Sequence, residues 1–273
     1  MENIVLENKQ CLIAGDGELP VYMAKSAKQN GFSVVCISLS SDNYKELKKY
    51  CSKVVSYGPG QIETIKKFLQ KEGIKQLTFL GKVSKTMLVK RPKLEKLAIK
   101  LLKDMKKLND DAIMLKIVEL LEGIGITILD QTIFIKNLMV QKGTLTKLAP
   151  NENQMDDIEY GFKIAKQMGG LDIGQSVVMK DRMIMAIEAI EGTDKCIKRG
   201  GKLAKKKNAT VVKVSKPAQD KRFDIPTVGL KTIKTMYRYG ANVLALESGE
   251  TIIVDKDKMI EYANKHKMSI IAL

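Results

Sequence analysis

The fold is decided at Cys11-Leu12-Ile13-Ala14-Gly15-Asp16-Gly17-Glu18-Leu19-Pro20, where a short apolar strand runs into a glycine-rich turn. A helix over residues 21–29 is expected next, because Pro20 suits the first helical turn, where its missing N–H costs nothing. Further strands are expected at residues 33–38, 53–55 and 76–80, with helices near residues 42–50 and at residues 62–72. Strands that alternate with helices predict a parallel sheet with right-handed crossovers.

The strand-helix alternation continues to residue 130 and then changes. A basic helical region is expected at residues 82–107, a helix at 112–122 and a strand at 126–129, whereas residues 132–140 are expected to be helical. Beyond them, the pattern predicts a helix at 153–168, a hairpin of strands at 175–179 and 183–189, and strands at 210–214, 243–246, 251–254 and 269–272. The predicted class is α/β, with a Rossmann-like domain over residues 1–130 and a mixed α/β domain over 131–273.

Composition narrows the class of protein. The chain has 273 residues, 44% of them hydrophobic and 29% charged, which is typical of a globular protein of two ordinary domains. Its amino terminus lacks the basic start and apolar core of a secretory signal, so we expect a cytoplasmic protein. The four cysteines lack the close-paired spacing of zinc or redox motifs, and we expect neither a zinc site nor a disulfide.

The basic composition and the histidine content argue against nucleic-acid binding and against histidine-dependent hydrolases. The net charge of +16 suggests phosphate binding. However, only five of the 47 basic residues are arginine, which is the preferred base-reading residue, and aromatic residues, on which bases stack, make up 5% of the chain with no tryptophan. A nucleic-acid partner is therefore not expected. The single histidine, His266, excludes serine hydrolases with a Ser/His pair and metal centres rich in imidazole. A hydrolase built on this sequence would therefore rely on carboxylates and an ion such as Mg²⁺.

Two segments are candidates for a binding site. The glycine turn matches only half of a dinucleotide-binding fingerprint, because Pro20 occupies the position of the third glycine. Its acidic residues, Asp16 and Glu18, would repel a phosphate at the start of the following helix. We therefore favour a turn that closely approaches a ligand such as a nucleoside over a purely structural turn. The second segment, residues 216–229, places Asp220 and Asp224 among lysine, arginine and glutamine side chains. Carboxylates suit a hard cation and bases suit phosphate oxygens, although a solvated turn explains the composition equally well.

Four blocks of the sequence carry a resemblance to a known family. They are Ala-Gly-Asp-Gly-Glu-Leu-Pro at 14–20, Leu-Asp-Ile-Gly-Gln-Ser-Val-Val at 171–178, Ala-Ile-Glu-Ala-Ile-Glu-Gly-Thr-Asp at 186–194, and Lys-Pro-Ala-Gln-Asp-Lys-Arg-Phe-Asp-Ile-Pro-Thr-Val-Gly at 216–229. Their order and content resemble the LpxI family, the histidine-poor UDP-2,3-diacylglucosamine pyrophosphatases of lipid A biosynthesis. The chain departs from the family in its lysine-rich region at 82–107.

The resemblance implies magnesium-dependent hydrolysis of UDP-2,3-diacylglucosamine to UMP and 2,3-diacylglucosamine 1-phosphate, with the substrate held between the two domains. It also implies peripheral association with the cytoplasmic face of the inner membrane, and it is compatible with a homodimer. Two other classes stay open from the residues alone: a Rossmann-type oxidoreductase, which the missing third glycine disfavours, and a noncatalytic nucleotide-sugar binding protein, which would tolerate loss of both aspartates.

The resemblance also assigns roles to residues. Asp220 and Asp224 are expected to bind Mg²⁺ and handle the attacking water, with Gln219 orienting an oxygen, whereas Lys216 and Arg222 contact phosphate. Thr193 and Asp194 are expected to approach the same site, although a helix cap is the alternative role for Thr193. The remaining expected binding residues are Gly15, Gly17, Leu19 and Pro20 in the first turn and Thr227, Gly229 and Thr232 at and just after the end of the second segment. The last three could bind phosphate through hydroxyls and backbone amides, or they could only open the following helix.

Overall fold

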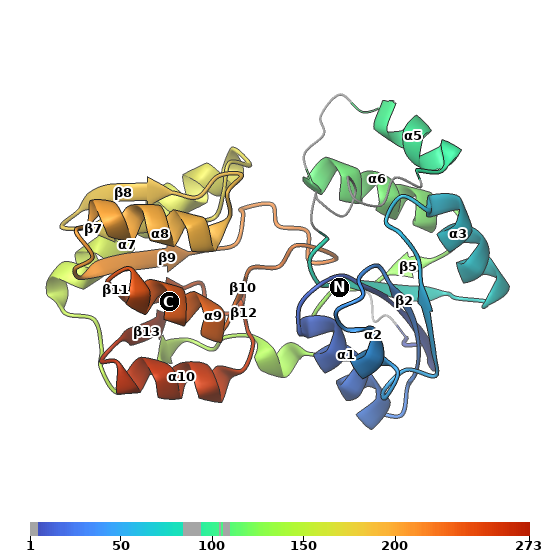
Figure 1. Cartoon of the computed structure of the whole chain (residues 1–273), viewed down its shortest axis with the longest axis horizontal. Coiled ribbons are helices and arrows are strands. Elements are labelled where there is room, and N and C mark those ends of the chain that lie inside the picture. Colours follow the sequence, from blue (N-terminus) through green and yellow to red (C-terminus); the bar gives the residue numbers. More distant parts are fainter. Residues whose placement is uncertain (1–4, 84–93, 104, 106–109) are drawn as a thin grey trace. The chain divides into compact units, whose positions relative to one another are not determined.

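The computed structural model describes residues 5–83, 94–103, 105 and 110–273. The chain divides into two compact units, coloured along the sequence in Figure 1. Unit 1 comprises Met1–Lys136 together with Lys221–Asp224, and unit 2 comprises Asn137–Asp220 and Ile225–Leu273. The four residues Lys221–Asp224 therefore belong to unit 1, although the chain on either side of them belongs to unit 2.

Unit 1 is built on a five-stranded parallel sheet of order β3-β2-β1-β4-β5. Its strands are β1 (Lys9–Ala14), β2 (Ser33–Ser38), β3 (Lys53–Ser56), β4 (Gln76–Leu80) and β5 (Thr127–Ile128). Its described helices are α1 (Leu19–Gln29), α2 (Tyr44–Leu47), α3 (Ile62–Lys71), α5 (Lys96–Lys103) and α6 (Asp110–Glu122). The chain moves outward from β1 first to one side and then to the other, which is the Rossmann-like order, and this confirms the predicted parallel sheet.

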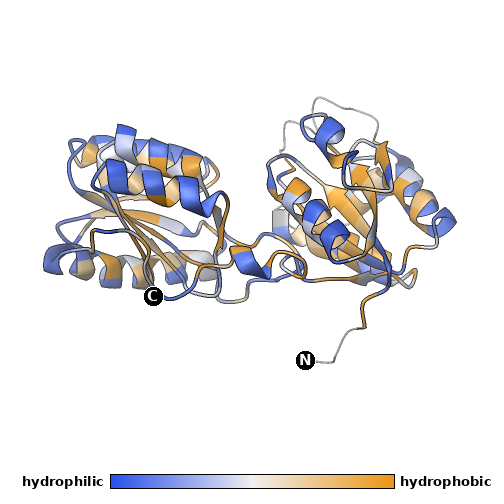
Figure 2. Ribbon diagram, turned by 90° about the horizontal axis from the view of Figure 1, so that it is seen from below, coloured by the Kyte–Doolittle hydropathy of each residue, from blue (hydrophilic) through white to orange (hydrophobic). Residues whose placement is uncertain are grey.

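Alternation along the strands gives unit 1 its core. Residues at every second position of β1, Cys11 and Ile13, pack with Phe68 of α3 and Leu121 of α6. Side chains of successive strand residues point to opposite faces, so a sheet covered on both faces needs nearly continuous apolar strands. The strands of this unit are correspondingly hydrophobic in Figure 2, whereas its helices carry both hydrophilic and hydrophobic residues.

Unit 2 contains a six-stranded mixed sheet of order β6-β13-β11-β9-β7-β8 and a separate two-stranded sheet of β10 and β12. Neighbours β13, β11 and β9 are parallel, while β7 and β8 form an antiparallel hairpin at one edge and β6 pairs antiparallel at the other. The strands are β6 (Gly143–Thr144), β7 (Ser176–Lys180), β8 (Met183–Ile187), β9 (Ala209–Lys213), β10 (Thr227–Val228), β11 (Ala241–Leu246), β12 (Ile252–Ile253) and β13 (Ser269–Ala272). This arrangement confirms the mixed α/β class predicted for the second half.

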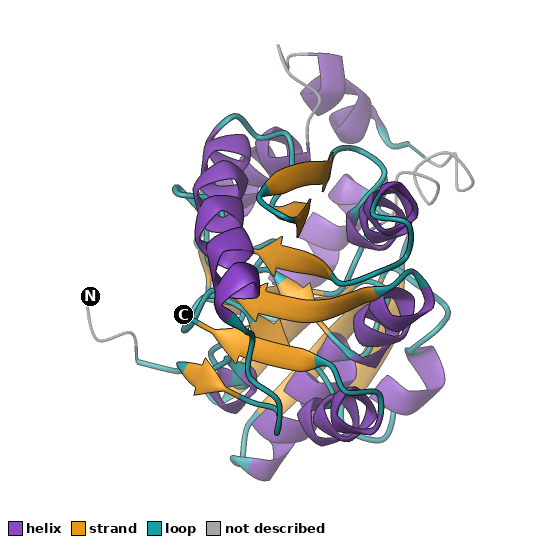
Figure 3. Cartoon of the chain, turned by 90° about the vertical axis from the view of Figure 1, so that its left-hand side faces the viewer, coloured by secondary structure: helices purple, strands orange, loops and turns teal. Residues whose placement is uncertain are grey.

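Helices cover both faces of this sheet, as the purple helices flanking the orange strands in Figure 3 show. They are α7 (Glu152–Gly170), α8 (Thr193–Leu203), α9 (Leu230–Arg238) and α10 (Lys256–Lys265). Consecutive residues of β9 belong to hydrophobic cores on opposite faces of the sheet. Val212 packs with residues of α7, and Val211 packs with residues of α8, α9 and α10. Within the described residues, no helix combines the length and apolarity that a membrane crossing requires.

The segment that was expected to form a helix at 132–140 does not do so. It contains turns and one short 3-10 helix, η1 (Lys136–Leu138), because polar side chains compete for the backbone. The Asp130 carboxylate accepts hydrogen bonds from the Thr132 N–H and hydroxyl, both at 2.6 Å. An aspartate that binds the backbone two residues ahead favours a turn over a helix.

Three other expectations differ in extent. The helix expected near residues 42–50 is reduced to Tyr44–Leu47, and the strand expected at 251–254 contributes Ile252–Ile253 to the two-stranded sheet. The basic region at 82–107 lies partly outside the described residues; among those that are described, Lys96–Lys103 is helical.

Candidate active site

The polar segment after β9 leaves unit 2 at the carboxyl edge of its sheet, where open α/β sheets bind their ligands. Lys213 ends β9 and pairs with Ser176, at the start of β7, and with Leu246, at the end of β11. Glu188 follows β8, and its N–H donates to the Ser176 carbonyl at 2.8 Å. The sheet therefore gathers Glu188, Lys213 and Glu247, the residue after β11, at one edge.

Glu247 fixes the first residues of the polar segment. Its Oε2 accepts hydrogen bonds from the Ser215 N–H and from the Ser215 hydroxyl, each at 2.8 Å, and Lys166 Nζ of α7 lies 2.6 Å from Oε1. Burial acts to raise the pKa of this carboxyl, but the Lys166 and Ser215 donors together outweigh burial and lower the pKa of Glu247. The backbone beside Lys216 is thus held by an ionised carboxylate.

We expect Glu247→Gln to destabilise the protein by about 1–3 kcal/mol near neutral pH, since Lys166 loses its charged partner. The folded-state pKa of Glu247 lies below its unfolded value, so this stabilisation is present above the ordinary carboxyl pKa and is lost as the pH falls through the folded value. Urea unfolding of wild type and variant should therefore differ near neutral pH and converge in acid. Glu159→Gln, an exposed glutamate on α7, is the control; a difference that stays constant with pH would contradict the expectation.

Lys216 and Gln219, two of the predicted site residues, lie together in one turn. The Gln219 side-chain Oε1 accepts from the Lys216 N–H at 3.3 Å, and the Gln219 N–H donates to the Lys216 carbonyl at 3.1 Å. Lys216 Nζ lies 2.7 Å from Asp172 Oδ1, with the lysine side chain 15% exposed. A phosphate that reaches Lys216 would share the ammonium with Asp172, a carboxylate that sequence reasoning did not place in the site.

The segment Lys221–Asp224 is anchored in unit 1. Phe223 is buried among the residues of the unit 1 core, and the Lys221 carbonyl accepts from the Gln131 N–H at 2.9 Å. Arg222 Nη1 lies 2.8 Å from Glu122 Oε1 at the end of α6. The predicted phosphate ligand Arg222 therefore has a carboxylate partner, as Lys216 does.

Asp224 has a left-handed backbone conformation, which aspartate adopts more readily than most other non-glycine residues do. Its φ is 61°, in the left-handed region, and it is exposed between buried Phe223 and buried Ile225. Most non-glycine residues pay about 1–2 kcal/mol for this conformation, but aspartate and asparagine tolerate it, because their short polar side chains can hydrogen-bond to the local backbone. Asp220 is half-buried and belongs to unit 2, whereas Asp224 belongs to unit 1, so the two carboxylates are carried by different units.

Thr193 occupies the first position of α8 and does not act as a cap, so the capping alternative is wrong. The N-cap is Gly192, and the Thr193 hydroxyl donates instead to Glu188 Oε1 at 2.8 Å. Lys213 Nζ donates to Thr193 Oγ1 at 3.1 Å and to the Thr227 carbonyl at 3.2 Å. Lys213, which was not predicted, thus connects two predicted residues, Thr193 and Thr227, and Glu188, also not predicted, contacts Thr193.

The remaining predicted residues of unit 2 surround the starts of α8 and α9. Gly229 is the extended N-cap of α9, and the Thr232 N–H donates to its carbonyl at 3.0 Å. The Thr227 hydroxyl donates to the Ile225 carbonyl at 3.1 Å. Asp194, in the first turn of α8, lies 2.9 Å from Lys231 Nζ in α9. These threonines and glycines order the backbone around the helix starts.

The glycine turn of unit 1 packs against the loop that follows β4. The Gly15 N–H donates to the Leu80 carbonyl, and Asp16 and Lys82 exchange two backbone hydrogen bonds, all at 2.8 Å. A Cβ on Gly15 would lie 2.7 Å from the Lys82 carbonyl oxygen, so the close approach at this position is to the protein's own backbone. Gly17, with φ of 97°, has open space where a Cβ would lie.

The acidic and apolar residues of this turn also have local partners. The Ser40 hydroxyl donates to the Asp16 carboxylate, and the Asn43 amide donates to the Gly17 carbonyl. Leu19 and Pro20 are the first two residues of α1, where Pro20 is buried and Leu19 is half-buried. Of the predicted turn residues, Gly17 therefore leaves the most room for a ligand.

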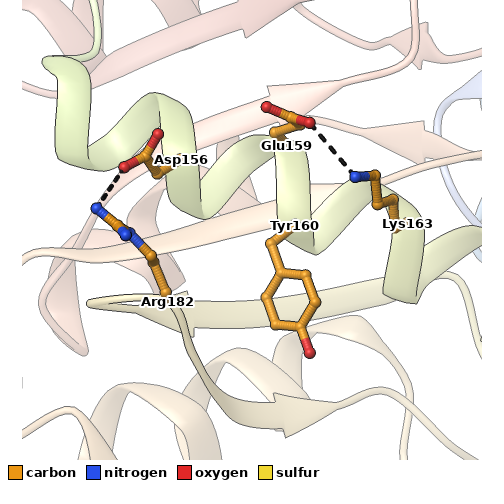
Figure 4. A pocket seen from close by; sticks show the side chains of 5 residues that line it. All are labelled: Asp156, Glu159, Tyr160, Lys163 and Arg182. Carbon is orange, nitrogen blue, oxygen red and sulfur yellow. Dashed lines mark hydrogen bonds and ion pairs between the residues drawn. The ribbon is translucent and has the colours of Figure 1, made fainter.

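A separate surface pocket of about 520 Å³ lies on α7 beside the turn between β7 and β8. Figure 4 shows its two ion pairs, Asp156 with Arg182 at 2.8 Å and Glu159 with Lys163 at 3.4 Å, on either side of Tyr160. Exposed pairs of this kind contribute about 0–1 kcal/mol each. Because the pocket contains none of the predicted site residues, it is distinct from the carboxyl edge of the sheet.

Sequence reasoning missed the charged residues that end buried strands. Lys213 follows the apolar run of β9, Glu188 follows β8 and Glu247 follows β11. A charged side chain at the end of an apolar strand was the available signal, since parallel strands place their carboxyl ends at one edge. Within the described part of the chain, no three histidine, cysteine, aspartate or glutamate side chains are grouped to hold a metal ion.

Comparison with known proteins shows that two protein-family models together match nearly the whole chain. Residues 9–138 match the model of the LpxI N-terminal domain, and residues 141–271 match that of the LpxI C-terminal domain. The UDP-2,3-diacylglucosamine pyrophosphatase LpxI of Caulobacter vibrioides is 30% identical over 263 residues, covering 93% of both chains.

Solved structures give weaker similarities. N5-carboxyaminoimidazole ribonucleotide synthetase from Thermotoga maritima matches with 16% identity and a TM-score of 0.25, covering 67% of this chain and 41% of that one. N5-carboxyaminoimidazole synthetase from Staphylococcus aureus matches with 18% identity and a TM-score of 0.26, covering 74% of this chain and 46% of that one. This chain thus spans less than half the length of either synthetase.

Proposed function

The chain belongs to the LpxI family, and on that premise we propose that it hydrolyses UDP-2,3-diacylglucosamine to UMP and 2,3-diacylglucosamine 1-phosphate in lipid A biosynthesis. The observation that carries the proposal is the extent of the match. Both family domains are present in order, and the pyrophosphatase from Caulobacter vibrioides is covered over 93% of its length. An enzyme that cleaves a phosphoric anhydride needs groups that neutralise the pyrophosphate and groups that handle the attacking water.

We assign the handling of water to Asp224 and Asp220. Asp224 is exposed, has a left-handed φ of 61° and lies between two buried residues, Phe223 and Ile225, that fix its position. A carboxylate fixed in this way is suited to orient a water molecule and accept its proton. Gln219 would orient an oxygen next to Asp220 in the chain. Lys216 and Arg222 would contact phosphate oxygens of the substrate. Each would do so while it also contacts a carboxylate of the protein, Asp172 for Lys216 and Glu122 for Arg222.

We propose Mg²⁺ as the cofactor, held by Asp220 and Asp224. The donor set fits this ion, because Mg²⁺ in phosphoryl-transfer sites is bound by one or two carboxylates and completes its shell with water and substrate phosphate oxygens. When bound, the ion would neutralise charge on the pyrophosphate. The lysines and arginine of the segment would add positive charge around the same phosphates.

We further propose that the protein works at a membrane surface as a peripheral protein. The net charge of +16 favours attraction to anionic lipids. Unit 2 also exposes large apolar side chains, with Ile190 89% exposed, Leu203 62% and Met183 56%. Basic charge together with exposed apolar side chains is the combination that supports interfacial binding, and the acylated substrate would be drawn from the same surface.

Phosphorus NMR of the full chain with UDP-2,3-diacylglucosamine in detergent tests the reaction. We expect the two coupled pyrophosphate resonances to be replaced by two monophosphate resonances, one from UMP and one from the acylated sugar phosphate. Incubation with UDP-N-acetylglucosamine, which has only an acetyl group at the sugar 2 position and a free hydroxyl at position 3 in place of long acyl chains, is the control for substrate class. An unchanged pyrophosphate spectrum from folded protein supplied with Mg²⁺ would refute the proposed function.

A further inference from the structure

We propose that the carboxyl-terminal ends of α8 and α9 form a docking surface through which unit 2 binds an anionic lipid bilayer. Exposed basic side chains define this surface, which we call the α8–α9 surface: Lys198, Lys202, Lys205, Lys206, Lys207 and Arg238. Leu203, the last residue of α8, lies among them in the sequence and is 62% exposed. The inference gives the membrane association of the proposed function a location, and it rests on that association but not on the reaction.

Backbone contacts join the ends of the two helices. A Cβ on Gly201 would lie 2.3 Å from the Tyr239 carbonyl oxygen, and a Cβ on Gly240 would lie 2.0 Å from the Lys206 carbonyl oxygen. The Lys206 N–H also donates to the Gly201 carbonyl at 2.8 Å. The loop that carries the lysines of residues 205–207 is therefore held against the ends of both α8 and α9.

Tyr239 marks the centre of the α8–α9 surface. Its ring centre lies 6.0 Å from Lys198 Nζ, 5.9 Å from Lys206 Nζ and 5.8 Å from Arg238 Cζ. These three bases come from α8, from the loop after it and from α9. An aromatic ring attracts a cation but carries no net charge, so the positive charges gathered here are not neutralised by it.

Carboxylates are scarce on this side of unit 2. Asp194 is the only acidic residue in the sequences of α8 and α9; it lies in the first turn of α8 and pairs with Lys231 at 2.9 Å. In the part of the chain that the structure describes, none of the basic residues of the α8–α9 surface forms an ion pair with a carboxylate. Like charges four residues apart on a helix, such as Lys198 and Lys202, repel each other. An anionic partner would relieve this repulsion.

Apolar side chains at the same place favour a bilayer over other anionic partners. Besides Leu203, the surface includes the start of β8, where Met183 is 56% exposed. Met183 pairs with Lys180 across the β7–β8 hairpin, and Lys180 Nζ donates to the Ala204 carbonyl at 3.3 Å, which brings the hairpin to the end of α8. Apolar side chains that enter the headgroup region while bases contact lipid phosphates are typical of interfacial binding, whereas a nucleic-acid backbone offers exposed aliphatic side chains no partner.

The α8–α9 surface lies at the edge of the sheet opposite to the candidate active site. The lysine loop leads directly into Ala209, which begins β9, whereas Lys213 ends β9 at the carboxyl edge. A bilayer bound at the α8–α9 surface would thus leave the carboxyl edge accessible. Loss of the surface should weaken lipid binding without changing the turnover of substrate dispersed in detergent.

Co-sedimentation of the full chain with vesicles tests the surface. The vesicles are phosphatidylcholine with phosphatidylglycerol as the anionic lipid, and vesicles of phosphatidylcholine alone are the neutral reference. Each base near an anionic surface strengthens binding by about fivefold, so Lys205→Gln, Lys206→Gln and Lys207→Gln combined should weaken binding to the anionic vesicles by about a hundredfold. Leu203→Ser should weaken it by about fivefold or more, because an apolar contact is lost. Added salt should release the wild-type protein.

A second triple variant is the matched control. Lys45→Gln, Lys48→Gln and Lys49→Gln combined remove the same charge from exposed lysines around α2 of unit 1, and this protein should bind as wild type does. Equal weakening by both triple variants would show that binding follows net charge, and it would overturn the α8–α9 surface. If the first triple variant does not fold, as judged by circular dichroism, Lys198→Gln combined with Lys202→Gln decides the question in the same way.

The remaining outcomes separate the surface from the other proposals. Full affinity of the folded surface variants for anionic vesicles would overturn the surface alone, and failure of wild type to bind these vesicles would overturn the membrane association with it. A single-stranded oligonucleotide that binds wild type more tightly than the vesicles do, and loses affinity in the lysine variant but not in Leu203→Ser, would assign the surface to nucleic acid instead. Vesicle binding through this surface by a protein that does not cleave UDP-2,3-diacylglucosamine would refute the proposed reaction alone.

Discussion

Asp224→Asn is expected to lower kcat for UDP-2,3-diacylglucosamine by about a thousandfold, because an amide cannot accept the proton of the attacking water. The side chains have nearly the same shape, and asparagine tolerates the left-handed backbone as aspartate does, so the φ of 61° at this position is preserved. We therefore expect the affinity for substrate to stay within about threefold of wild type, which separates a role in the reaction from a role in binding.

Single-turnover kinetics with radiolabelled substrate, together with equilibrium binding, would measure both quantities. Asp181→Asn is a matched control, because Asp181 is also exposed and left-handed, with φ of 50°, but lies in the turn between β7 and β8. The control should retain wild-type kcat. Retention of the full rate by Asp224→Asn would show that Asp224 has no part in the chemistry.

The parallel sheet of unit 1 could be predicted because its information is local. Apolar runs such as Cys11 to Ala14 alternate with helical segments over short distances, and connection rules then leave few topologies. The failure at residues 132–140 is also local: Asp130 binds the backbone of Thr132, and this side-chain competition outweighed the helical pattern. Local periodicity thus predicted the order of the elements well, although some are shorter than expected and one expected helix is replaced by turns where a turn-forming side chain intervenes.

The site was harder to predict because its residues are brought together by register. Glu188 follows β8, Lys213 ends β9 and Glu247 follows β11, and only the pairing of β8, β7, β9 and β11 places them at one edge. The sequence did indicate the polar segment at 216–229, but it could not show that Phe223 anchors four of its residues in unit 1. Nor could composition show that Lys216 and Arg222 already contact Asp172 and Glu122.

Gly15 shows why the role of a glycine turn is hard to predict. The sequence favoured close approach of this turn to a ligand such as a nucleoside, which stays a prediction, whereas the structure shows a close approach to the protein itself, since a Cβ would lie 2.7 Å from the Lys82 carbonyl oxygen. The neighbouring group is a loop of the same unit, which the spacing of glycines cannot distinguish from a ligand. Gly17 keeps the open space that a ligand would need.

Removal of divalent cations with excess chelator is expected to lower turnover by at least about a hundredfold, and added Mg²⁺ should restore it. If Asp220 and Asp224 hold the ion, replacing either by asparagine removes one negative ligand and should raise the Mg²⁺ concentration for half-maximal rate by about tenfold or more. The residual rate of each variant should then increase with Mg²⁺ at concentrations that already saturate wild type.

A direct readout of the ion distinguishes binding from catalysis. Mn²⁺, which shares the preference of Mg²⁺ for oxygen ligands, can be titrated into protein and UMP and followed by electron paramagnetic resonance. We expect fewer bound Mn²⁺ ions in Asp220→Asn and Asp224→Asn than in wild type, and no change in Asp181→Asn. Turnover that persists in chelator, with equal Mn²⁺ binding in all four proteins, would contradict both the cofactor and its proposed ligands. Loss of Mn²⁺ binding in only one of the two variants would assign the ion to that carboxylate and leave the water to the other.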